Sequence, residues 1–185
     1  MEKVRLGPRT LFYPLPAVLV GVKVDERPNY LTASWYGIAT SKPPVLSVAL
    51  QPVRYTLKGI KEQGPFPINV ASADMAEDVD YCGVYSGHIR DKSQIFQPFY
   101  GVTETVLLIE GCLVNFECIV LHSLDLGSHT LIIGQIVETH IHESFLTHGK
   151  ADPEKIDPLL FIPGTRQYHR LGEVIAKTFH VGREV

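Results

Sequence analysis

The chain has little of what marks several common protein classes. It has 185 residues with a net charge of −3 and a pI near 6.2, and its basic residues are scattered. A protein that binds nucleic acid through phosphate contacts needs a basic patch, so the composition argues against that function. The chain has three cysteines and no C-x-x-C spacing, which favours neither a disulfide framework nor a zinc site.

Long apolar runs are also missing. No stretch reaches the roughly 20 residues that cross a bilayer, so we expect no membrane partner. The N-terminus carries Glu2, Lys3 and Arg5 without an apolar segment, which predicts that there is no signal peptide. Together with the odd number of cysteines, this favours a cytoplasmic protein.

Familiar nucleotide and catalytic motifs do not occur. There is no G-x-G-x-x-G, and Gly59 and Gly64 have P-loop spacing but lack the Lys and Ser/Thr that should follow.

The eight histidines raise the question of a metal site. His140 and His142 would share one face of a strand, yet with His129 and Glu138 they are too few to name a metal. We therefore predict exposed sheet histidines and no metal site.

Short strands dominate what is present. They are separated by turns and by two short helices, with no regular βαβ alternation, so a doubly wound fold is not expected. A closed or nearly closed antiparallel barrel would hide the many strand edges. We expect one domain over 1–185. Strands are expected at 17–24, 31–38, 45–50, 66–71, 105–110, 112–121, 129–142 and 167–171, with a turn at 25–29. One helix is expected at 56–62, capped by Thr56, and a second helix from Ser72 or Asp74 to about Cys82. Residues 174–179 are expected to form a weak helix or a tail.

The stretch 28–37 holds the only Trp and concentrates amide, hydroxyl and aromatic groups behind an apolar run. Ala33 and Ser34 are small residues between large rings, so backbone N–H groups there could approach a flat partner. One interpretation is the floor of a site for a planar, phosphate-bearing cofactor. The other is a polar hairpin entering a core strand, with Trp35 as ordinary core filler. The residues alone leave both open.

A second stretch has features that are typical of a phosphate-binding site. Arg54 would precede the helix at 56–62, with Thr56 at its N-cap. A helix N-terminus offers free N–H groups, and an Arg adds a fork of donors. The alternative is a surface Arg beside an ordinary Thr cap.

Six segments, in this order, resemble the flavin reductase-like, FMN-binding split-barrel family, and its flavoredoxin-like members most closely. The resemblance implies a mainly β fold, an antiparallel split β-barrel of the FMN-binding split-barrel type. The segments are Asn29-Tyr-Leu-Thr-Ala-Ser-Trp35, Lys42-Pro-Pro-Val-Leu-Ser-Val48, Arg54-Tyr55-Thr56, Phe66-Pro-Ile-Asn-Val70, Ser86-Gly87 with Asp91-Lys92, and His129-Thr-Leu-Ile-Ile-Gly-Gln-Ile-Val137.

The resemblance further implies one non-covalent FMN per subunit of a homodimer, near the dimer interface. No catalytic side chain is implied, because the flavin does the chemistry. By position, the flavin would be lined by Asn29, Thr32, Ala33, Ser34 and Trp35; the phosphate would lie at Arg54, Tyr55 and Thr56, with added charge from Lys92; and His169 would lie by the ring.

The family contains both NAD(P)H-dependent flavin reductases and electron carriers. The resemblance therefore implies a redox flavoprotein, either a reductase with NAD(P)H as substrate or a flavoredoxin-like carrier with a redox protein as partner. The motifs do not separate these two roles. A different hypothesis, suggested by the histidines, is a non-catalytic barrel that binds another planar ligand such as haem.

Overall fold

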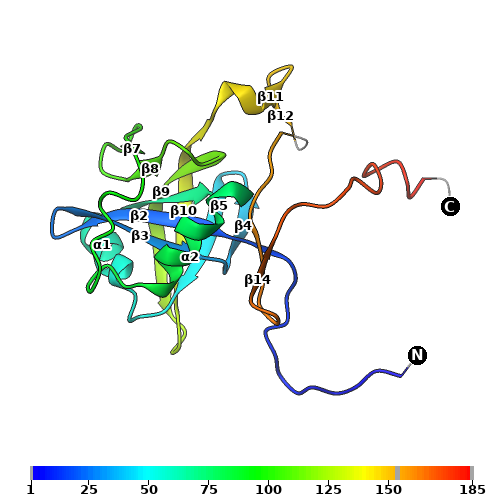
Figure 1. Cartoon of the computed structure of the whole chain (residues 1–185), viewed down its shortest axis with the longest axis horizontal. Coiled ribbons are helices and arrows are strands. Elements are labelled where there is room, and N and C mark those ends of the chain that lie inside the picture. The colour runs from blue at the N-terminus through cyan, green and yellow to red at the C-terminus, as the bar shows by residue number, and fades with distance from the viewer. Residues whose placement is uncertain (1, 153–154, 184–185) are drawn as a thin grey trace.

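A computed structural model describes residues 2–152 and 155–183, so residues 1, 153–154 and 184–185 of the predicted domain lie outside the described part. Its centre is a seven-stranded antiparallel sheet in the order β3-β2-β6-β9-β10-β5-β4 (Figure 1). The strands are β2 (Val18–Val24), β3 (Arg27–Ala33), β4 (Tyr36–Ser41), β5 (Pro44–Leu50), β6 (Pro65–Val70), β9 (Val114–Asp125) and β10 (Thr130–Ile141).

Shorter elements surround this sheet. The helices are α1 (Tyr55–Gln63), α2 (Ala76–Val84) and the 3₁₀ turns η1 (Ala73–Met75) and η2 (Glu143–Phe145). Small antiparallel sheets join β1 (Leu15–Pro16), β13 (Leu160–Ile162) and β14 (Gln167–His169), then β7 (Pro98–Phe99) and β8 (Leu108–Ile109), and β11 (Leu146–Thr147) and β12 (Lys150–Ala151).

The two edge strands of the main sheet are consecutive in the chain, so the sheet must curl to bring them together in space. β3 and β4 lie at opposite ends of the strand order, yet only Ser34 and Trp35 separate them. The Ala49 amide donates to the Trp35 carbonyl at 2.8 Å and fastens this link to β5. The barrel is therefore split at Ser34–Trp35. The predicted mainly β, antiparallel split barrel is confirmed.

The hairpin that precedes the split differs from the prediction. The turn contains only Asp25 and Glu26, with φ of 50° and 63°, as a two-residue hairpin turn of the primed type requires. Pro28 and Asn29 therefore belong to β3. The single strand predicted over 31–38 is wrong, because the chain leaves the sheet at Ser34 and re-enters it as an edge strand at Tyr36.

Both faces of β2 are buried, and they separate two apolar clusters. Val18, Val20 and Val22 point into the barrel, where they meet residues of β5, β6 and β10. Leu19 points the other way, into a second cluster that includes Val79 of α2. Helix α2 packs on β3 and covers this outer face (Figure 1). The three free cysteines are buried, which is typical of small apolar side chains.

Helix α1 begins one residue earlier than predicted. Arg54 is its N-cap residue and makes no side-chain cap, so the predicted Thr56 cap is wrong. Thr56 is only 1% exposed, and its hydroxyl accepts a hydrogen bond from Asn29 instead. Neither N-cap predicted for the second helix is found: Ser72 is the N-cap residue of η1 but makes no side-chain cap, and α2 follows η1 directly with Met75 as its N-cap residue.

Two extended segments leave the body of the molecule, and Figure 1 shows both projecting from it. We call residues 2–13 the N-terminal arm and residues 171–183 the C-terminal arm. The last strand, β14, ends at His169, and Arg170 then contacts the carboxylates of Asp74 and Asp157. The described part of 174–179 forms no helix, so the tail alternative holds there. Within the described residues, no helix is both long and apolar enough to cross a bilayer.

Candidate functional site

A cavity of about 320 Å³ opens where the barrel is split, and we call it the split cavity. The link between β3 and β4 forms one wall, and the end of β5 forms another. Its lining residues are Leu31, Thr32, Ala33, Ser34, Trp35, Ala49, Leu50, Gln51, Arg54, His129 and Phe161. Four of the predicted flavin-lining residues, Thr32 to Trp35, are therefore side by side at one opening.

Aromatic rings shape the split cavity. The Trp35 indole stacks on the His129 imidazole with centroids 4.6 Å apart and planes 29° apart. Trp35 is 44% exposed, so its interpretation as core filler is wrong. The Thr32 hydroxyl donates to the Val79 carbonyl, which ties β3 to α2 behind the cavity. The result is a fixed opening with a flat aromatic wall, which suits a planar ligand.

A smaller cavity of about 130 Å³ adjoins the first, since Leu31 and Arg54 line both. We call it the cation cavity. The residues that line it, all within the described part, include two cations and no carboxylate. They are Asn29, Leu31, Val53, Arg54, Tyr55, Thr56, Val84, Tyr85, Ser86, Gly87 and Lys92.

Lys92 is a buried cation whose hydrogen bonds go to neutral groups. It is 2% exposed, and its ammonium donates to the Tyr30 carbonyl at 2.9 Å and the Cys82 carbonyl at 3.0 Å. Burial lowers the pKa of Lys92, and the charge of Arg54 lowers it further while Cys82 opposes the shift. No carboxylate in the described part forms an ion pair with it. A buried charge without a counter-ion is costly, so the cavity favours an anionic ligand.

Asn29 supplies an unused polar atom to the same cavity. Its Nδ2 donates to the Thr56 Oγ1 at 2.7 Å, whereas its buried Oδ1 has no partner in the described part. An amide turned by 180° would accept from the Thr56 hydroxyl and present its NH₂ group to the cavity, and the two orientations are assigned from their partners. Only the turned amide fits the phosphate end of a flavin nucleotide, because phosphate oxygens accept hydrogen bonds and the NH₂ group donates them.

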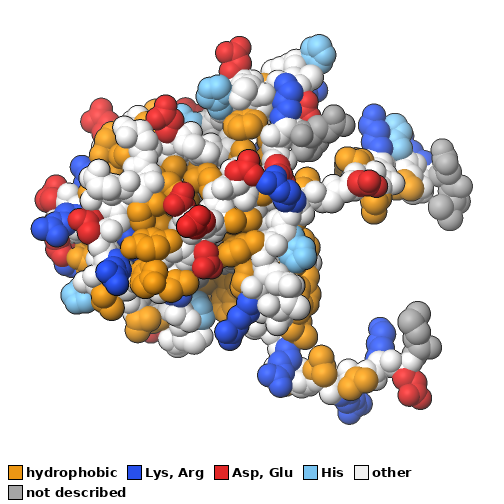
Figure 2. Space-filling model, viewed as in Figure 1, with side chains coloured by type: hydrophobic (Ala, Val, Ile, Leu, Met, Phe, Trp, Pro, Cys, Tyr) orange, Lys and Arg blue, Asp and Glu red, His pale blue; other side chains and the backbone are white. Residues whose placement is uncertain are grey.

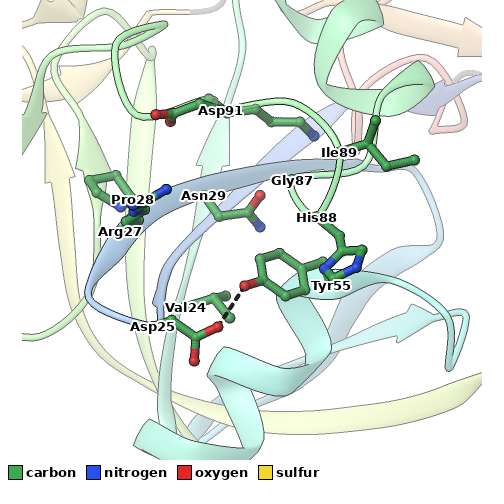
Figure 3. A pocket seen from close by; sticks show the side chains of 11 residues that line it. Val24, Asp25, Arg27, Pro28, Asn29, Tyr55, Gly87, His88, Ile89 and Asp91 are labelled. Atoms are coloured by element: carbon green, nitrogen blue, oxygen red, sulfur yellow. Dashed lines mark hydrogen bonds between the residues drawn. The ribbon is translucent and has the colours of Figure 1, made fainter.

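Gly87 closes this end of the site. A Cβ on Gly87 would lie 1.8 Å from the Asn29 Oδ1, so only glycine lets the loop lie so close to β3. Asn29, Tyr55, Gly87 and Lys92 also line a third cavity of about 490 Å³. Figure 3 shows Asn29 beside the Tyr55 ring there, with the Tyr55 hydroxyl donating to Asp25 at 2.8 Å.

The structure thus brings nine of the ten predicted site residues to the two cavities. The tenth, His169, is exposed on β14 and lines neither. Phe161 reaches the split cavity instead, from β13, where it is paired with Tyr168. Sequence reasoning missed Phe161 and His129 as lining residues. His129 had a signal, because it begins one of the six family segments, whereas Phe161 stood in a short apolar run without a motif.

Of the histidines predicted to be exposed, His142 is exposed, whereas His140 is partly buried. Glu117, buried on β9, accepts hydrogen bonds from the Val102 and Thr103 amides, the Thr103 hydroxyl, and His140 at 2.6 Å. Burial raises the pKa of Glu117, but these hydrogen bonds outweigh it, and the net shift is downward. His140 is partly buried because its ring bonds to this buried carboxylate. In the described part no three His, Cys, Asp or Glu side chains form a metal-ligand group.

Comparison with known proteins decides the family. The protein-family model described as a flavin reductase like domain matches residues 10–172, most of the chain. The chain belongs to the flavin reductase-like family. This confirms the family that the sequence resembled.

Solved structures related to this flavin reductase-like chain resemble it over nearly its whole length. Flavoredoxin from Methanosarcina acetivorans is 32% identical with a TM-score of 0.96, covering 100% of this chain and 99% of that one. Flavoredoxin of Desulfovibrio vulgaris (Miyazaki F) is 37% identical with a TM-score of 0.89, covering 98% and 100%. An FMN-binding protein from Thermus thermophilus is 28% identical with a TM-score of 0.82, covering 96% and 100%. The predicted likeness to flavoredoxin-like members is confirmed, and the family supports a flavin-related redox function.

Proposed function

We propose that this chain is an FMN-binding redox protein with one FMN per subunit. The ring would occupy the split cavity, and the phosphate would occupy the cation cavity. One observation carries the proposal: two cations, Arg54 and Lys92, line a cavity without a carboxylate directly beside an aromatic-walled opening. A flavin mononucleotide would match both features, because it has a planar ring for the aromatic opening and a terminal phosphate dianion for the cations.

At the phosphate end, the chain holds its donors in place before a ligand arrives. The Arg54 Nη1 donates to the Gly83 carbonyl at 3.1 Å, which fixes the guanidinium between α1 and α2. Lys92 is held by its two carbonyl contacts, and Thr56 is held by Asn29. Preorganised donors of this kind bind an anion without a further ordering cost.

At the ring end, the bound flavin would supply the chemistry by accepting a hydride or single electrons. Trp35 and His129 would pack beside the ring, and Phe161 would limit its depth. Backbone N–H groups of the Ser34–Tyr36 link would stabilise negative charge that develops at the ring edge. We assign no acid or base to a side chain.

Of the two family roles, we favour an electron carrier that exchanges electrons with a redox protein. Its support is the full-length similarity to two flavoredoxins. The second candidate is an NAD(P)H-dependent flavin reductase. A mainly apolar cavity of about 590 Å³ supports it, because Ser34 and Trp35 line this cavity as well as the split cavity and leave room for a nicotinamide. Steady-state oxidation of NADH and NADPH with added FMN separates the roles, and turnover with either excludes a pure carrier.

Homodimer formation and a cytoplasmic location stay predictions. The test of the main proposal is an absorption spectrum of the purified protein, with mass spectrometry of the released ligand. We expect a flavin spectrum and the mass of FMN. A colourless protein that ignores added FMN would contradict the proposal, and Soret absorption on adding haem would favour the planar-ligand alternative.

A further inference from the structure

The third cavity, of about 490 Å³, adjoins the phosphate end of the proposed flavin site but not its ring end. Asn29, Tyr55, Gly87 and Lys92 line both this cavity and the cation cavity, whereas no residue lines both this cavity and the split cavity. Its volume lies within the range that small ligands occupy. A phosphate held at Lys92 therefore leaves two directions for the rest of its molecule: toward the split cavity, or into the third cavity.

Charges of both signs surround the third cavity. Figure 2 shows acidic and basic side chains interspersed at the end of the molecule where Figure 1 places the β2–β3 turn. The Asp25 carboxylate is already in use, because it accepts hydrogen bonds from Lys58 at 2.7 Å and from the Tyr55 hydroxyl at 2.8 Å. The titratable side chains that line the cavity are Asp25, Arg27, Tyr55, His88, Asp91 and Lys92.

Asp91 offers the cavity a free acceptor. Its Oδ1 accepts the Ser93 amide at 2.8 Å, and no hydrogen bond among the described residues uses its Oδ2. The hydrogen bonds from Ser93 lower the pKa of Asp91 from 3.8, and the charge of Arg27 acts in the same direction, so the carboxylate is ionised at neutral pH. An ionised carboxylate accepts hydrogen bonds only, and neighbouring ribose hydroxyls are donors that carboxylates bind in dinucleotide-binding folds.

Two aromatic rings provide a place for a planar group. The Tyr55 and His88 rings both line the cavity, with centroids 5.6 Å apart and planes 57° apart. In the view of Figure 3, the Asp91 carboxylate and these two rings lie on opposite sides of Asn29. Ile89, which is 78% exposed, adds an apolar neighbour. Nucleic-acid bases stack on aromatic faces of this kind, because every base has a π-face.

We propose that the third cavity binds the nucleoside of a purine nucleoside 5′-phosphate, with the phosphate at Lys92, the ribose hydroxyls at Asp91 and the base against Tyr55 and His88. The turned Asn29 amide donates to a phosphate that reaches it from either cavity. A purine suits the wall better than a pyrimidine, because its N7 accepts from a guanidinium, and Arg27 forms no ion pair among the described residues.

Because Lys92 holds one phosphate at a time, this nucleotide and FMN exclude each other. The competition rests on the proposed FMN function, whereas the nucleotide site does not. A purine nucleotide would thus act as an inhibitor of flavin loading, at a site that overlaps the flavin site only at its phosphate.

The test uses the purified full chain, freed of any flavin, and calorimetric titration with AMP. Adenosine lacks the phosphate, and ribose 5-phosphate lacks the base. Asp91→Asn removes the free carboxylate oxygen but keeps an acceptor for Ser93, and His88→Ala removes one ring. Glu26→Gln is the matched control, because Glu26 belongs to the same β2–β3 turn as Asp25 but does not line the cavity. Thermal unfolding checks that each variant is folded.

We expect AMP to bind the wild type, and adenosine and ribose 5-phosphate to bind about tenfold or more weakly. Asp91→Asn should weaken AMP binding about tenfold and His88→Ala about fivefold or more, with FMN affinity unchanged in both. Glu26→Gln should bind both ligands as the wild type does. Added AMP should raise the apparent dissociation constant of FMN in proportion to its concentration.

The outcomes separate the nucleotide site from the flavin site. A wild type that does not bind AMP, adenosine that binds as tightly as AMP, or Asp91→Asn with wild-type AMP affinity would overturn the nucleotide site. Simultaneous binding of AMP and FMN would overturn the shared phosphate position. AMP binding that depends on Asp91 and His88, in a chain that never binds FMN, would refute the proposed function and leave the nucleotide site intact.

Discussion

Replacing Lys92 with Met isolates the charge that the proposed site is built around. Met keeps much of the side-chain volume but removes the buried ammonium. A hydrogen bond to a charged group contributes about 1.5–3 kcal/mol, so Lys92→Met should weaken FMN binding by roughly 10- to 150-fold. Riboflavin has the same ring without the phosphate, so its affinity should hardly change. Fluorescence titration of both flavins gives the two constants.

The matched control is Lys58→Met. Lys58 is another lysine near the site, but it is exposed on α1 and pairs with Asp25 at 2.7 Å. Exposed pairs contribute little, so its FMN affinity should change by less than about threefold. If Lys92→Met binds FMN as tightly as the wild type, or loses riboflavin to the same extent, the phosphate does not lie at Lys92.

The pH dependence of folding stability and of FMN binding provides a second test of Lys92. Its pKa is lowered from the ordinary 10.5 by burial. Between the lowered pKa and 10.5, the unfolded chain holds a proton that the folded apo-protein has released, so stability rises with pH in that window. FMN binding needs the charged form and should weaken in the same window. Lys92→Met should abolish both trends, which denaturant titrations and FMN titrations across that pH range can check.

Three further predictions concern other parts of the structure. Gly87→Ala should weaken FMN binding by about tenfold or more, because its Cβ would displace Asn29, whereas Gly111→Ala, with nothing within 4 Å of its Cβ, should match the wild type in the same titration. Glu117→Ala should lower the free energy of unfolding by about 1–3 kcal/mol in urea, because the Val102 and Thr103 amides lose their acceptor. Because the pKa of Glu117 is lowered from 4.5, the wild-type contribution should persist above pH 4.5 and disappear as pH falls through the lowered pKa. Emission from Trp35, the only Trp, should be quenched by FMN with an end point of one flavin per chain; unchanged emission would place the ring elsewhere.

Much of the barrel could be predicted from local pattern. The strands that became β2, β5 and β6 are short apolar runs bounded by turn residues or prolines, and their ends were predicted within one or two residues. The break at Ser34–Trp35 could not be seen this way. No Gly or Pro marks it, and it arises because the rolled sheet ends there. The same break creates the split cavity, so the site depends on a feature that only the three-dimensional structure shows.

The sequence also could not predict which distant residues strand pairing brings together. Phe161 enters the site because β13 pairs with β1 and β14, none of which is longer than three residues. Glu117 meets His140 because a register shift lies between Ile136 and Glu138 on β10. A one-residue shift reverses which face a side chain occupies, and nothing in the sequence fixes it. Family resemblance predicted Lys92, but only the structure shows that it is buried and that no carboxylate among the described residues pairs with it.

The most direct test of the account is a crystal structure of the protein grown with FMN. We predict the phosphate between Arg54 and Lys92, within hydrogen-bond distance of both, and the ring in the split cavity against Trp35. A phosphate bound away from these two cations, or a ring outside the split cavity, would contradict the central claim.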